Sequence, residues 1–223
     1  MDIFFVFLMA IMFGCPIALA VVGFVKSRSS RSVPESDMAQ GVHSSALPRI
    51  VNSAVLYALA YNLVFFMQEL FLVLPKAMWG LKPTLFHNNH TWVGFDPIQD
   101  LLQGSGALTI LIIGFVSIGV LIKQHQSTGL FKLFTLWLVY QGLTQSLPQL
   151  SDMVLNPNGD VGDALGYLNV SQFFGVGLAY LSFIAVIVLG IMLTRPLLEL
   201  APSAASVDTP GKRTKFVLQI GSL

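Results

Sequence analysis

Five long apolar blocks constrain the fold of this chain more than any other feature of its sequence. They cover residues 3–25, 50–74, 104–123, 131–150 and 169–194, and polar or Gly/Pro/Asn-rich stretches separate them. A helix needs about 20 apolar residues to cross the roughly 30 Å hydrocarbon layer of a bilayer. Each block meets that length, so the sequence predicts an all-α integral membrane protein with five transmembrane helices.

Charged residues are too few for an ordinary soluble protein. Only 10% of the 223 residues are charged and 54% are apolar, whereas soluble domains carry about 25% charged residues. The longest of the remaining stretches are a loop at 26–49, an outer loop at 75–103 and a tail at 195–223. None is long enough to build a separate soluble domain, so we expect one membrane domain over residues 1–223. With a net charge of +1 and no concentrated basic patch, we expect no nucleic-acid partner.

The distribution of basic residues predicts the orientation. Lys and Arg accumulate in cytoplasmic loops. If the 26–49 loop is inside, ten of the twelve basic residues face the cytoplasm, and only Lys76 and Lys82 face outward together with six of the eleven acids. We therefore expect an extracytoplasmic N-terminus and a cytoplasmic C-terminal tail, in a plasma or inner membrane.

The second and fourth blocks resemble each other near their outer ends. Residues 68–75 (QELFLVLP) and 141–148 (QGLTQSLP) share Gln, two Leu and Pro, and the returning segments begin with Asp96 and Asp160 as candidate N-caps. This pattern favours one anchor helix followed by two parallel-related hairpins, and parallel repeats occur in transporters. A chance match between leucine-rich segments is the alternative.

Glu69 is the only acidic residue inside a predicted span, and Asn62 lies seven residues earlier on the same helical face. A charge at this depth is costly unless it is paired, hydrated or protonated. In a structural interpretation, Glu69 bonds to Gln145 or a tyrosine and holds helices together, so Glu69→Gln leaves stability nearly unchanged. The other interpretations are a metal ligand, a proton relay and a contact with lipid head groups.

A polar stripe follows the fourth span, where Gln141, Gln145 and Gln149 recur at four-residue intervals. Such a stripe should face protein or water rather than lipid. It either lines a small outward-opening cavity shared with Glu69 or joins helices through amide hydrogen bonds. The second interpretation is favoured.

The outer loop carries the sequence His87-Asn88-Asn89-His90. Two histidines three residues apart can bind one metal ion if another group, such as Glu69, supplies a third ligand. We therefore expect this loop to fold back over the end of the second span and approach Glu69. In the alternative interpretation the polar residues cap a turn and four aromatic residues lie at the head-group level. These are Trp79, Phe86, Trp92 and Phe95.

No catalytic motif identifies a reaction. The short loops and small residues at packing spacing, such as Gly175 and Ala179, favour a non-catalytic multi-pass subunit or scaffold that packs with membrane partners or with itself. The alternative is an outward-facing metal or small-molecule site, or a membrane enzyme, built around Glu69, His87 and His90. A third hypothesis, a transporter half that dimerises, depends on the repeat. Apart from that candidate metal, the sequence identifies no cofactor.

Overall fold

The computed structural model describes residues 46–86, 89–124 and 129–221. The predicted first span at 3–25, most of the 26–49 loop and His87 lie outside these ranges. The chain divides into two compact units. The described part of one is residues 46–54 with 197–221, and that of the other, the unit of residues 55–196, is 55–86, 89–124 and 129–196.

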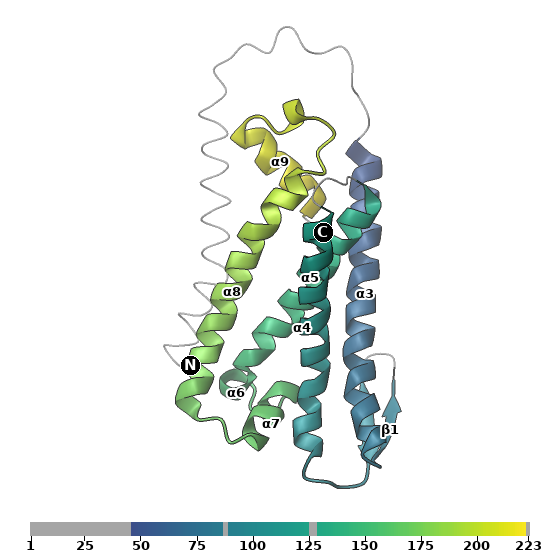
Figure 1. Cartoon of the computed structure of the whole chain (residues 1–223), viewed down its shortest axis with the longest axis vertical. Helices are drawn as coiled ribbons and strands as arrows, with labels where there is room; N and C mark the ends of the chain where they lie inside the picture. The colour runs from purple at the N-terminus through teal and green to yellow at the C-terminus, as the bar shows by residue number, and fades with distance from the viewer. Residues whose placement is uncertain (1–45, 87–88, 125–128, 222–223) are drawn as a thin grey trace. The chain divides into compact units, whose positions relative to one another are not determined.

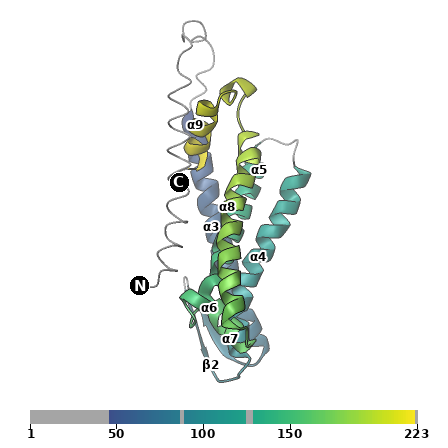
Figure 2. The same ribbon diagram turned by 90° about the vertical axis from the view of Figure 1, so that its left-hand side faces the viewer.

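The described elements are mostly helices, with a short hairpin of two strands between the first two long helices (Figures 1 and 2). In chain order they are α3 (Ala46–Met78), β1 (Lys82–Leu85), β2 (His90–Val93), α4 (Gln99–Lys123), α5 (Leu130–Ser146), η2 (Leu147–Ser151), α6 (Asp152–Leu155), α7 (Asp160–Tyr167), α8 (Gln172–Leu198), η3 (Ala204–Ser206) and α9 (Pro210–Gly221). The long helices coincide with apolar blocks because a helix satisfies its own backbone hydrogen bonds in lipid.

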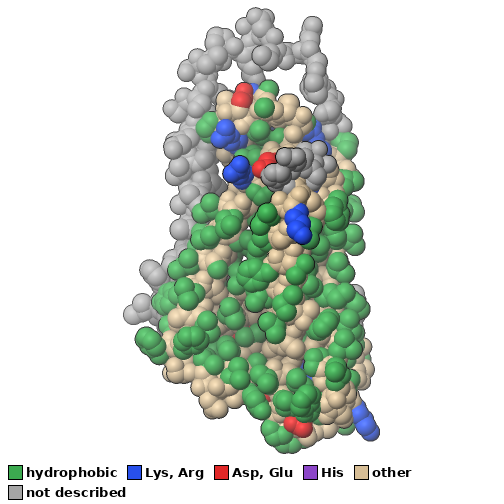
Figure 3. Space-filling model, viewed as in Figure 1, with side chains coloured by type: hydrophobic (Ala, Val, Ile, Leu, Met, Phe, Trp, Pro, Cys, Tyr) green, Lys and Arg blue, Asp and Glu red, His purple; other side chains and the backbone are tan. Residues whose placement is uncertain are grey.

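Three of the described helices are long and apolar enough to cross a membrane: Leu47–Met78 within α3, α4 and α8. The prediction of a mostly helical chain with membrane-length apolar helices is therefore confirmed for these three helices. In the unit of residues 55–196, Figure 3 shows hydrophobic side chains over most of the visible helical surface. Such a surface suits contact with lipid tails.

The helix ends differ from the predicted span limits. α5 ends at Ser146 rather than 150, and the chain continues as the 3-10 helix η2 because Pro148 lacks the N–H that a regular helix needs. α4 begins at Gln99, before the predicted 104, and α8 runs on to Leu198 through Pro196.

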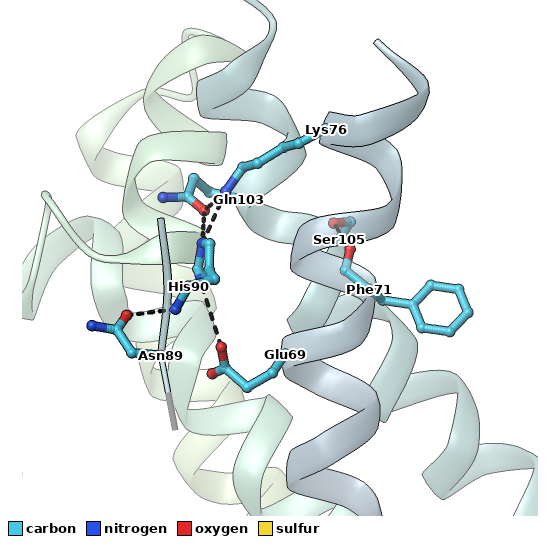
Figure 4. Close-up of polar contacts among 7 residues, drawn as sticks. All are labelled: Glu69, Phe71, Lys76, Asn89, His90, Gln103 and Ser105. Carbon is cyan, nitrogen blue, oxygen red and sulfur yellow. Dashed lines mark hydrogen bonds and ion pairs between the residues drawn. The ribbon is translucent and has the colours of Figure 1, made fainter. Parts of the chain in front are cut away.

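α3 also continues past a proline, to Met78, where the sequence predicted the outer loop to begin at Pro75. Pro75 has no N–H to give to the carbonyl of Phe71, one helical turn earlier. The hydroxyl of Ser105 on α4 lies 2.5 Å from that carbonyl oxygen (Figure 4). It lies equally close to the oxygen of Leu102, and its single proton serves one acceptor at a time. Ser105 is thus placed to supply the donor that Pro75 lacks whenever its proton is directed at Phe71.

Glycines on α4 let three other helices of this unit approach closely. A Cβ built on Gly106 would lie 2.7 Å from Leu72 on α3, and one on Gly104 would lie 2.8 Å from Ala164 on α7. Gly142 of α5 crosses α4 so tightly that its Cβ would lie 2.8 Å from the Gly114 backbone. Close backbone approach at small residues is the usual way in which helices associate in membranes. α4 is therefore the helix around which α3, α5 and α7 pack.

Candidate functional site

Two ionisable side chains of α3 lie on one face of that helix, two turns apart. Glu69 and Lys76 are separated by seven residues, a spacing that returns to the same helical face. Glu69 is 8% exposed and Lys76 is fully buried. Buried charges persist only when other groups pair with them, so the neighbours of this pair define the site.

The hairpin of β1 and β2 brings His90 to this pair. Side chains alternate along a strand, so His90 and Trp92 share the inner face of β2 while Thr91 and Val93 are exposed. Nδ1 of His90 lies 3.2 Å from Oε2 of Glu69, and Nε2 lies 2.9 Å from Nζ of Lys76 (Figure 4). The imidazole therefore stands between the carboxylate and the ammonium.

Gln103, in the first turns of α4, completes the His90 cluster, which consists of Glu69, Lys76, His90 and Gln103. The Lys76 ammonium donates to its Oε1 at 2.5 Å, and that oxygen also lies 3.2 Å from His90 Nε2. All these contacts agree with one assignment: a neutral His90 whose Nδ1–H donates to Glu69, while Nε2 and Oε1 both accept from Lys76. The short distance between Nε2 and Oε1 follows because both atoms accept from the same ammonium.

Trp92 covers the lysine end of this cluster. Nζ of Lys76 lies 3.9 Å from the centroid of the Trp92 ring, within the range of a cation–π contact. The ring stacks beside His90, with centroids 5.8 Å apart, and its Nε1–H donates to Oε1 of Gln99 at 3.0 Å. Trp92 therefore links the hairpin to the start of α4 and shields the ammonium.

Carboxyl groups from α6 and α7 surround the same end of the unit. Asp160, Glu69 and Asp163 are the acids whose charges act on Lys76. Burial raises the pKa of Asp160, and the positive charge of Lys76 partly offsets this increase. Burial, with a smaller effect of the Asp160 charge, raises the pKa of Asp152 to about 6. This end of the unit thus holds several carboxyl groups that bind protons more readily than usual.

The structure does not bring the other predicted polar residues to Glu69. Asn62 is exposed, and its amide donates to the carbonyl of Ala58 in its own helix. The glutamines bond along their own chain segment: Gln145 donates to Oε1 of Gln141 and Gln149 donates to the carbonyl of Gln145, both at 2.9 Å. The expected amide links between helices are therefore replaced by bonds within α5 and η2. Gln141 is 2% exposed, and its Nε2 has no hydrogen-bond partner in the described part of the chain.

The metal interpretation is incomplete in the residues that the structure describes. Among them, no three His, Cys, Asp or Glu side chains gather so that they could hold an ion. His90 has Glu69 on one ring nitrogen and Lys76 on the other. Histidine ligands often pair one ring nitrogen with a carboxylate and the other with a metal. In this cluster the Lys76 ammonium lies where such a metal would bind, while His87 lies outside the described residues.

Sequence reasoning missed Lys76 and Gln103. Lys76 was counted as an outer-loop cation because Pro75 suggested the end of the helix. Its distance of seven residues from Glu69 was the available signal, and it becomes informative only once α3 is known to continue through Pro75. No sequence signal distinguishes Gln103 from the other polar residues at the start of α4.

Comparisons with known proteins give no further guidance. No family model matches the chain, and no curated protein or solved structure matches it.

Proposed function

We propose that this chain is a non-catalytic, multi-pass membrane subunit or scaffold, which packs with other membrane proteins or with further copies of itself. The observation that carries the proposal is the hydrogen bonding among the members of the His90 cluster. Glu69, His90, Lys76 and Gln103 use one another as partners. These hydrogen bonds hold the hairpin against the ends of α3 and α4. In a catalytic site, by contrast, the reactive groups must face a substrate.

The outward surface of α8 supports lateral packing. Leu181 is 65% exposed and Ile191 is 64% exposed, and a Cβ added at Gly177 or Gly190 would meet nothing within 4 Å. Gly175 and Ala179, which the sequence offered for partner packing, are buried within the chain instead. A partner helix would therefore contact the other side of α8.

Site-specific photo-crosslinking in the native membrane tests this proposal. A photoreactive residue at Leu181 should form an adduct with a polypeptide, either a partner or a second copy, that co-purifies at a fixed ratio in mild detergent. The same residue at Phe183, which is 7% exposed, is the matched control and should not form that adduct. Adducts with lipid alone from position 181, together with a monomeric mass, would refute the proposal.

We also propose five spans, with the N-terminus outside and the C-terminal tail inside. The support is the distribution of basic residues, of which ten out of twelve then face the cytoplasm. In a Cys15→Ser background, Ser29→Cys and Ser206→Cys should be protected from an impermeant thiol reagent in intact cells, while Asn158→Cys should react. Labelling at position 29 from outside would reverse the orientation. Opposite sidedness of positions 29 and 206 would exclude an even number of spans between them.

An outward-facing metal or small-molecule site is the second candidate function. The observation in its favour is that two acids with raised pKa values, Asp160 and Asp163, act on Lys76 of the His90 cluster. Groups with shifted pKa values are common at functional sites. Elemental analysis of the purified protein distinguishes the candidates. A stoichiometric metal lost in both Glu69→Gln and His90→Ala would favour this site, and a metal-free protein with a fixed-ratio partner would favour the subunit.

A further inference from the structure

The unit of residues 46–54 and 197–221 contains a cavity of about 380 Å³, lined by residues of this unit alone. Its walls come from the start of α3, from the segment around η3 and from α9. α9 is amphipathic: Phe216 and Ile220 are buried, and Ser53 of α3 donates to the carbonyl of Ile220 at 2.9 Å. These contacts fix α9 against α3, so the cavity has defined walls.

Three basic side chains line this cavity: Arg49, Lys212 and Lys215. Nζ of Lys212 contacts Asp208 at 3.0 Å and donates to the carbonyl of Ala205, so part of this positive charge is already balanced within the chain. The described part of the unit carries four basic residues against two acidic ones. In Figure 3, Lys and Arg side chains are visible on this unit. The cavity is therefore suited to an anion.

The rest of the lining combines hydrogen-bond donors with apolar surface. Ser203 and Gln219 provide hydroxyl and amide donors, whereas the Ser206 hydroxyl already donates to the carbonyl of Ser203 at 2.6 Å. Ile50 and Phe216 provide apolar walls. A small inorganic anion would leave the apolar walls without a matching partner. A ligand that carries a charged phosphate on a hydrocarbon body would use both kinds of surface.

We propose that this cavity binds the phosphate head group of an anionic phospholipid. The basic side chains would hold the phosphate, and the apolar walls would contact the glycerol and the first methylene groups. We expect the cavity to lie near the membrane surface, because its lining residue Arg49 is only two positions from Leu47, where the candidate membrane span within α3 begins. Basic pockets at the ends of membrane helices are suited to anionic head groups.

Binding of a short-chain phosphatidylglycerol to the purified full-length protein, in neutral phosphocholine micelles, tests the proposal. Native mass spectrometry and the shift in unfolding temperature should both show saturable binding. One basic residue near an anionic lipid contributes about fivefold in affinity, so Lys212→Gln/Lys215→Gln should weaken binding about 25-fold. The matched control is Lys123→Gln, since Lys123 is an exposed cation in the last turn of α4 and does not line the cavity.

A second ligand distinguishes a lipid from a free phosphate compound. Glycerol 1-phosphate has the charged group without acyl chains and should bind far more weakly than phosphatidylglycerol. Equal affinity for the two would overturn the lipid assignment. Binding that is not saturable, or that the double variant retains unchanged, would overturn the site itself. If the double variant unfolds early in neutral micelles, Lys215→Gln alone serves as the test, with about fivefold weaker binding expected, because Lys215 is exposed.

Discussion

Removing the charge of Glu69 should destabilise this protein because the Lys76 ammonium would lose its partner charge across His90. Lys76 is fully buried, and Nζ lies 2.9 Å from the His90 ring nitrogen that faces away from Glu69. Breaking a buried charge pair typically costs about 3–5 kcal/mol. Asp160 and Asp163 also act on Lys76, so we expect the lower end, about 3 kcal/mol, for Glu69→Gln. The structural interpretation of the sequence expected almost no change, since it did not include Lys76.

A double-mutant cycle separates the charge pair from general packing. Glu69→Gln/Lys76→Met removes both charges and leaves neither one unpaired, so its loss should be at least about 2 kcal/mol smaller than the sum of the single losses. The exposed hairpin residue Lys82 provides the matched control, because Lys82→Met makes the same chemical change without burial. That control should stay within about 0.5 kcal/mol of the wild type.

Thermal unfolding in mild detergent measures these differences. For a chain of 223 residues, about 3 kcal/mol corresponds to a decrease of about 6–12 °C in unfolding temperature. The reasoning would be refuted if the stability losses of the two single variants add up to the loss of the double variant. It would also be refuted by a Glu69→Gln protein that unfolds at the same temperature as Lys82→Met.

Three further predictions concern other parts of the structure and use the same unfolding assay. Ser105→Ala should lower the free energy of unfolding by about 1 kcal/mol. The loss should be smaller in a Pro75→Ala background, where residue 75 regains the N–H that can bond to the carbonyl of Phe71. Equal losses in the two backgrounds would contradict the role of Ser105 as a substitute donor. Gly142→Ala should cost about 1–3 kcal/mol through collision with α4, whereas Gly119→Ala, with nothing within 4 Å of its added Cβ, should not destabilise α4; equal effects would exclude the tight crossing. Burial raises the pKa of Asp152 to about 6, so the contribution of Asp152 to stability is present below about pH 4 and is lost as the pH rises through about 6. Asp152→Asn should make stability depend less on pH in this range. A variant with the same pH profile as the wild type would refute this prediction.

The sequence by itself determined the membrane class and the position of Glu69 as a residue that needs a partner. Apolar blocks of about 20 residues have few alternatives to spanning helices, because lipid offers no hydrogen bonds to an open backbone. An isolated carboxyl in such a block likewise requires a nearby polar group. The expectation that the His90 loop folds back toward Glu69 rested on that requirement, and the structure places the two side chains 3.2 Å apart.

Only the tertiary structure decided what surrounds Glu69. Lys76 joins the cluster because α3 passes Pro75, and the Ser105 hydroxyl that is placed to supply the missing donor belongs to another helix, thirty residues later in the chain. Asn62 and the glutamines of α5 had the right residue types, yet their amides bond within their own segments. Sequence spacing places residues on the face of one helix, but it does not state which faces meet. That depends on close contacts between helices, such as the crossing at Gly142, which only the packed structure reveals.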